Sequence, residues 1–139
     1  MNQDSENSTS PLAAFNVEDF ASIGIVSCLP DAPLEEVAFL MANNRVDAAV
    51  VADDDAAEPP VIADADVVSA AASGHFAELR AGDIAGKSAV SIANDEGLDR
   101  AAALLADKGA SHLVVRDSRR TPIGVLSTLD LARAIGKQA

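Results

Sequence analysis

The sequence contains the same pattern twice, and this internal repeat constrains the fold more than any other feature. A shift of 64 positions aligns the first half of the chain with the second without a gap, and it places Asp66 on Asp130. The same shift superposes further pairs: Asp19 on Asp83, Ser27 on Ser91, Asp31 on Asp95, Leu34 on Leu98, Leu40 on Leu104, and Val50 and Val51 on Val114 and Val115. Because turns, helices and polar positions coincide in register, we interpret the chain as two copies of one supersecondary unit.

Each copy shows the same succession of predicted elements. Apolar residues at helical spacing predict helices, and short apolar runs between turn residues predict strands. In the first copy we expect a short helix at 16–21, a strand at 25–29, a helix at 34–44, strands at 47–52 and 61–62 around an acidic turn at 53–60, and a helix at 66–72. In the second copy the equivalents are 83–85, 89–93, 98–107, 113–115, 123–126 and a helix ending near 135. This alternation alone predicts a small α/β or α+β domain.

The composition restricts the classes of partner and of chemistry. The 139 residues carry a net charge of −12, which argues against nucleic acid and anionic membranes as partners because both would repel the chain. Cys28 is a lone cysteine and no apolar run approaches the roughly 18 residues of a membrane helix, so we expect a cytoplasmic protein. Two distant histidines, His75 and His112, predict no metal site, and no nucleophile or phosphate-loop motif indicates an enzyme.

The end of the last predicted strand carries the residues best suited to bind a ligand. Gly124 permits close approach to the backbone, and Ser127 and Asp130 put a hydroxyl and a carboxylate where the strand gives way to a helix. A carboxylate can accept hydrogen bonds from vicinal sugar hydroxyls, and a hydroxyl with the first helix amides suits a phosphate. The alternative is structural, because both residue types also cap helices.

The order G-h-h-S-x-x-D, preceded by H-L-x-V at 112–115, resembles the closing half of a CBS (cystathionine-beta-synthase-type) motif. Over the whole chain the resemblance is to a tandem pair of such motifs, a Bateman module. It implies an α+β fold of two β-α-β-β-α motifs packed about a pseudo-twofold axis, and a homodimer formed through helices. The expected division is a disordered tail at 1–14, CBS motif 1 at 15–74, a connector at 75–80 and CBS motif 2 at 81–139.

The resemblance also implies a ligand site in the second repeat, whose occupant would be an adenine nucleotide such as AMP, ADP or ATP. Base contacts are expected from the strand residues, ribose hydroxyls at Asp130, and phosphate at Ser127 with Arg133 one helical turn beyond Asp130. The expected ligand-binding residues are Val90, Ser91, Ile92, His112, Leu113, Ser127, Asp130 and Arg133.

The first repeat departs from this pattern. Ser27 and Asp66 are kept, but Pro60 replaces the glycine and Ala63 replaces the hydroxyl of Ser127. Proline removes an N–H group, alanine cannot bond a phosphate, and Asp64 would repel one. The site at Ser27 and Asp66 is therefore expected to be the weaker one.

The predicted function is a stand-alone regulatory protein with no catalytic residues, no metal and no required cofactor. An adenosyl ligand would bind mainly in the second-repeat cleft and alter the packing of the repeats or of the dimer, which an unidentified regulated protein could read. The alternative is a ligand-independent dimerisation or docking module whose nucleotide sites have decayed.

Overall fold

The computed structural model describes residues 10–52, 59–86 and 90–137. Residues 1–9 of the predicted tail, 53–58 of the predicted acidic turn and the beginning of the strand predicted at 89–93 lie outside these ranges. Within residues 10–14 of the predicted tail, Leu12 is buried at 4% exposure and the Ala13 amide donates to the Ser10 carbonyl oxygen, whereas Pro11, Ala13 and Ala14 are exposed. Burial of this leucine explains why the folded chain begins before residue 15.

The chain forms two compact units, residues 24–90 and residues 1–23 with 91–139. Each unit is mixed α+β and contains most of one repeat, so the expected fold class and the β-α-β-β-α order are confirmed. The units do not coincide with the repeats, since each contains the opening segment of the other repeat. Val17, from the first repeat, donates its amide to Glu96 at 2.8 Å, and Ala81, from the second, donates to Ala32 at 2.9 Å.

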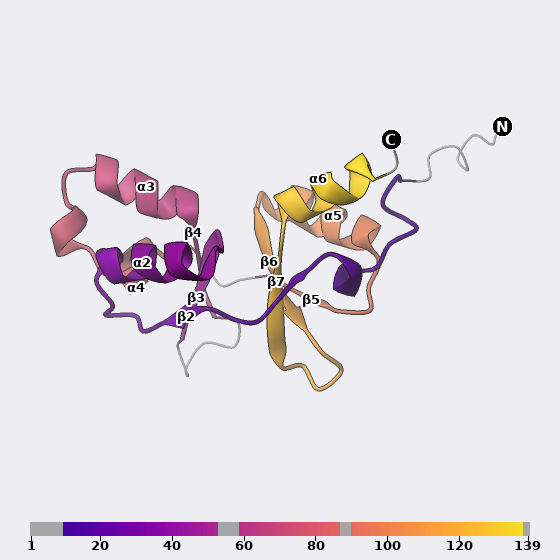
Figure 1. Cartoon of the computed structure of the whole chain (residues 1–139), viewed down its shortest axis with the longest axis horizontal. Coiled ribbons are helices and arrows are strands. Elements are labelled where there is room, and N and C mark those ends of the chain that lie inside the picture. Colours follow the sequence, from indigo (N-terminus) through magenta and orange to yellow (C-terminus); the bar gives the residue numbers. More distant parts are fainter. Residues whose placement is uncertain (1–9, 53–58, 87–89, 138–139) are drawn as a thin grey trace. The chain divides into compact units, whose positions relative to one another are not determined.

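The unit that contains most of the second repeat has a four-stranded sheet of order β1-β7-β6-β5. Its strands are β1 (Ser22–Ile23), β5 (Ser91–Ala93), β6 (His112–Arg116) and β7 (Pro122–Ser127), and its helices are η1 (Val17–Asp19), α5 (Leu98–Lys108) and α6 (Thr128–Gly136). Strand β6 pairs parallel with β5, to which it is connected through a helix, and antiparallel with β7, to which it is connected by a hairpin turn. Figure 1 shows α6 following directly from β7, without an intervening loop.

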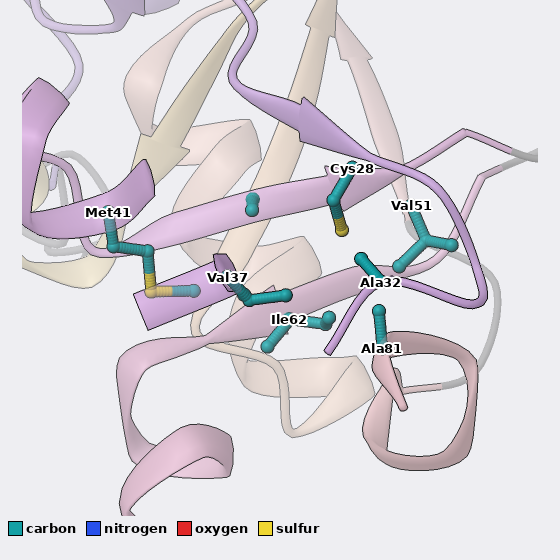
Figure 2. Packing of buried hydrophobic residues seen from close by; sticks show 8 residues of the cluster. Cys28, Ala32, Val37, Met41, Val51, Ile62 and Ala81 are labelled. Atoms are coloured by element: carbon teal, nitrogen blue, oxygen red, sulfur yellow. The ribbon is translucent and has the colours of Figure 1, made fainter. Parts of the chain in front are cut away.

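The unit that contains most of the first repeat has a three-stranded sheet of order β2-β3-β4. Its elements are β2 (Ser27–Cys28), α2 (Leu34–Asn44), β3 (Ala48–Val51), β4 (Val61–Ala63), α3 (Asp64–Ala72), η2 (Phe76–Glu78) and α4 (Ala81–Ile84). Mainly aliphatic side chains, together with Cys28 and Met41, form its core, which includes Val37, Val51 and Ile62 (Figure 2). Ala81 of α4 is fully buried in this core, so the opening helix of the second repeat covers residues of the first.

The two long helices end in the same way. The residue that follows α2 is Arg45, with φ 55°, and the residue that follows α5 is Gly109, with φ 60°; these two residues are 64 positions apart. A left-handed residue at this position lets the following amide turn back to the last carbonyl groups of the helix. Glycine adopts this conformation without strain, whereas arginine does not.

Candidate functional site

Two polar side chains are buried at the junction of β7 and α6. Ser127 is 7% exposed and Asp130 is 5% exposed, and among the described residues they are the two polar ones that fall in the core. A buried polar group is costly unless it is hydrogen-bonded, so each should have partners within the chain.

Ser127 and Asp130 satisfy one another in a capping box. Asp130 Oδ2 accepts from the Ser127 amide at 2.9 Å and from Ser127 Oγ at 3.2 Å. In return, the Asp130 amide donates to Ser127 Oγ at 3.2 Å. This arrangement starts α6 at Thr128, and it realises the capping role that the sequence left open as an alternative.

The other carboxylate oxygen of Asp130 faces a cation. Arg133 Nη1 lies 3.3 Å from Asp130 Oδ1, one helical turn along α6, and the arginine side chain is 62% exposed. Asp130 and Arg133 therefore lie close together, as predicted. The guanidinium group contacts the Asp130 carboxylate, however, whereas the prediction placed it beside a phosphate. The pair has one end in the core and one in solvent.

The aspartates repeated along the chain share a structural role. Asp19, Asp66 and Asp83 each accept a hydrogen bond at 2.8 Å from the amide three residues earlier, at the start of η1, α3 and α4 respectively. Asp130 makes the equivalent bond but is alone among the four in being buried. Capping therefore explains why aspartate recurs, whereas the burial and the Ser127 hydroxyl are specific to the junction of β7 and α6.

Three predicted site residues lie on one face of the second-repeat sheet. In the strand register His112 is opposite Ser127, and Ser91 is opposite Val114, two residues along β6 from His112. Because side chains alternate along a strand, Ser91, His112 and Ser127 point to the same side. Ser91 and His112 are half-buried, and Val90, immediately before β5, is also half-buried.

Two other predicted contacts point to the opposite side of the sheet. Ile92 is 5% exposed and Leu113 is fully buried, and both pack in the core of their unit. The alternation that places Ser91 and His112 on one face requires this. Their side chains are therefore core residues, and the structure does not bring them together with Ser127.

The polar residues on this face have partners within the chain. Arg116 Nε donates to Ser91 Oγ at 2.9 Å, and Ser111 Oγ lies 2.8 Å from His112 Nδ1. The contact between Arg116 and Ser91 could not be found from the sequence, because it joins residues 25 apart on neighbouring strands and no motif marks it. It places a guanidinium group on the face that carries Ser91.

Gly124 and the first amides of α6 have roles other than those expected. A Cβ atom at Gly124 would overlap the Ser22 carbonyl oxygen of β1, so the close approach is made by the chain itself. The Thr128 amide donates to Ser111 O at 3.0 Å, and the Asp130 amide donates to Ser127 Oγ. Fewer helix amides are therefore left for an anion than the sequence predicts.

The residues predicted to form a weaker site in the first repeat are arranged differently from their counterparts. Ser27 is exposed on β2, and Asp66 is half-buried at the start of α3. Ala63 occupies the N-cap position of α3 without a side-chain hydrogen bond. Serine in place of this alanine is what distinguishes the second-repeat junction chemically.

The remaining candidate chemistry is limited. Within the described ranges no group of histidine, cysteine or acidic residues is arranged to hold a metal ion, and none of the described helices has both the length and the apolar character to span a bilayer.

Cys28 is buried, with its sulfur in the core cluster of Figure 2. Burial, and then the Glu36 carboxylate, raise the pKa of this thiol. A hollow of about 300 Å³ is lined by Pro33, Leu34, Glu35, Phe76, Ala77 and Arg80, none of them a predicted site residue.

Comparison with known proteins supports the interpretation of the repeat. The family model described as the CBS domain matches residues 17–70 and 81–137. No curated protein matches the chain. Among solved structures, the CBS domain protein PAE2072 from Pyrobaculum aerophilum, complexed with AMP, is 28% identical, with a TM-score of 0.74 over 89% of this chain and 97% of that one.

Two other solved structures share the fold at lower identity. The CBS domain pair of protein MJ0100, in complex with 5′-methylthioadenosine and S-adenosyl-L-methionine, is 18% identical, with a TM-score of 0.76 over 90% of this chain and 98% of that chain. The hexameric CBS-CP12 protein from bloom-forming cyanobacteria is 20% identical, with a TM-score of 0.76 over 85% of this chain and 69% of that one.

Proposed function

This chain belongs to the CBS domain family, and from that premise we propose that it is a regulatory CBS pair that binds an adenosyl ligand and catalyses no reaction. The ligand we propose is an adenine nucleotide, AMP, ADP or ATP, held mainly by the second repeat. Binding would shift the populations of packing states of the repeats or of a dimer, which a regulated protein could read.

The observation that carries this proposal is the buried pair of Ser127 and Asp130. A carboxylate in the core beside a hydroxyl, at the start of a helix, can take two sugar hydroxyls and an anion. The relative from Pyrobaculum aerophilum, 28% identical over most of both chains, was solved with AMP, which favours a nucleotide as the occupant.

The proposed binding surface combines this junction with one face of the sheet. Ser91 and His112 lie on the face that carries Ser127, and Val90 precedes Ser91. We assign the base to these residues and the ribose to Asp130. Arg133 is the cation for the phosphate, because its side chain is exposed on the same helical turn.

The first repeat is the weaker candidate. Asp66 caps α3 as Asp130 caps α6, but Ala63 offers no hydroxyl, and the exposed Asp64 adds a negative charge at the helix start. A phosphorylated ligand would be repelled there.

Calorimetric titration with AMP, ADP and ATP tests the proposal. Asp130→Ala removes both the proposed ribose contact and a helix cap, whereas Asp66→Ala removes an equivalent cap from the first repeat. We expect wild type and Asp66→Ala to bind, and Asp130→Ala to lose about tenfold or more in affinity. Equal affinities for the three proteins would remove Asp130 from the site, and no heat with any nucleotide would remove the function.

One observation favours a ligand-independent docking module instead. The Asp130 carboxylate already accepts hydrogen bonds from Ser127 and Arg133, so it needs no ligand to supply it with donors. A thermal shift assay separates the two functions. Millimolar nucleotide should raise the melting temperature of a sensor by mass action, and it should leave that of a docking module unchanged.

We also propose that the protein is a homodimer joined through helices. Phe39 on α2 and Val68 on α3 are 65% and 68% exposed, and such large apolar side chains suit burial against a second copy. The structurally similar CBS-CP12 protein is hexameric, which favours assembly in this family. Sedimentation velocity should show a dimer for wild type and for Leu29→Glu, an exposed apolar residue outside the helices, and a monomer for Phe39→Glu. A monomeric wild type would contradict this assembly.

A further inference from the structure

The acceptor positions of Asp130 are unequally occupied. Oδ2 accepts two hydrogen bonds, from the amide and the hydroxyl of Ser127, and each carboxylate oxygen has about two lone pairs. Oδ1 accepts from Arg133 Nη1 at 3.3 Å, a longer contact than the usual charge-assisted bond. The oxygen that a new donor can reach is therefore the one that Arg133 faces.

A ribose diol presents two neighbouring O–H donors and needs acceptors for both. Since Oδ2 is engaged in the cap that starts α6, the diol must use Oδ1 and so compete with the guanidinium group. The arginine can move, because its side chain is 62% exposed, whereas Asp130 is fixed in the core.

We infer that Arg133 is an exchangeable partner of Asp130 and that this exchange makes the site select phosphorylated nucleosides. The ribose hydroxyls displace Arg133 from Oδ1, and the released guanidinium group binds the phosphate of the same ligand. A nucleoside without a phosphate must break the same ion pair but offers Arg133 no replacement. This inference rests on the proposed adenosyl site and adds its specificity.

The first repeat lacks an arginine that could exchange in this way. The residue one turn beyond Asp66 is Ser69, an exposed residue of α3 that has no charge. The two repeats therefore share the aspartate cap but differ in the exchangeable cation.

Calorimetric titration of the full chain with AMP and with adenosine tests the inference. Arg133→Met removes the guanidinium group and keeps a long helix-forming side chain. Arg100→Met is the matched control, because it removes one exposed arginine from α5 of the same unit and so accounts for the change in net charge. Arg133→Lys keeps the charge without the planar fork.

We expect Arg133→Met to weaken AMP binding about tenfold. Adenosine binding should stay equal or become up to about fivefold tighter, because a partly exposed ion pair no longer competes. Arg100→Met should leave the ratio of the two dissociation constants unchanged, and Arg133→Lys should retain part of the preference for AMP.

Two other results have distinct meanings. If wild type binds AMP and adenosine but Arg133→Met changes both affinities by the same factor, the exchange is wrong and the nucleotide site stands. If wild type binds neither ligand, the proposed function itself is overturned.

Discussion

Asp66 and Asp130 make the same hydrogen bond in the two repeats. Each uses Oδ2 to accept the amide three residues earlier, at 2.8 Å in the first repeat and 2.9 Å in the second. The residues whose amides donate these bonds differ, since Ser127 has a hydroxyl that accepts a hydrogen bond from the Asp130 amide and Ala63 has none. One change of side chain at a shared position thus separates a simple cap from a buried polar pair.

This difference predicts opposite effects of two substitutions. Ala63 has the extended backbone of an N-cap residue, so Ala63→Ser should stabilise the protein by about 0.5–1 kcal/mol. Ser127→Ala removes the hydroxyl that accepts from the Asp130 amide, and it should cost about 1–2 kcal/mol. Urea unfolding of the two variants checks both signs, and a destabilising Ala63→Ser would contradict the shared geometry.

The two helix ends give a second matched pair. Arg45 has φ 55°, in the left-handed region that its counterpart Gly109 occupies at φ 60°. Arg45→Gly should stabilise the protein by about 0.5–1 kcal/mol, and Gly109→Ala should destabilise it by about 1 kcal/mol. Thermal melting measures both, and equal effects of the two substitutions would show that the positions are not equivalent.

The antiparallel pairing of β1 with β7 predicts that Gly124 cannot be replaced by a larger residue without loss of stability. A methyl group there would overlap the Ser22 carbonyl oxygen, which is backbone and cannot rotate away. Gly124→Ala should therefore cost about 1–3 kcal/mol and speed amide hydrogen exchange in β1. Gly136→Ala is the control, because a Cβ there meets nothing within 4 Å. A Gly124→Ala protein as stable as wild type would mean that β1 does not pair as described.

The buried thiol predicts a loss of stability at alkaline pH. Burial, assisted by Glu36, raises the pKa of Cys28 above its ordinary value of 9.0. In the unfolded chain the thiol ionises first, so its contribution is complete below pH 9.0 and is lost as the pH rises toward the higher folded pKa. Urea unfolding between pH 8 and pH 10 should show a steeper decline for wild type than for Cys28→Ala. Parallel curves would contradict a raised pKa.

Much of the fold could be predicted because its signals are local. Periodic apolar residues predict α2 and α5 almost to the residue, and the repeat predicts that the two units share one element order. The exchange of opening segments could not be predicted, because the amide of Val17 meets Glu96 and that of Ala81 meets Ala32 across long stretches of chain. Both contacts are hydrogen bonds between backbone atoms, and the pattern of side chains along the sequence does not indicate them.

The arrangement of the candidate site could be predicted in part, where its residues are close in sequence. Ser127, Asp130 and Arg133 are neighbours in sequence, and the structure brings them together. Ile92 and Leu113 were expected at the ligand, but strand alternation turns their side chains into the core. Strand register decides which face a side chain occupies, and a single-residue shift in register reverses it.

The central claim is that an adenine nucleotide binds where β7 meets α6, and a titration of the ¹⁵N-labelled protein with AMP, followed by amide chemical shifts, tests it most directly. The first repeat provides an internal control, since Ala63 and Asp66 occupy the positions of Ser127 and Asp130 in an equivalent cap. We predict that the amides of Ser127 and Asp130 shift in a saturable manner while those of Ala63 and Asp66 stay in place. Shifts confined to the first repeat, or none at saturating AMP, would contradict the claim.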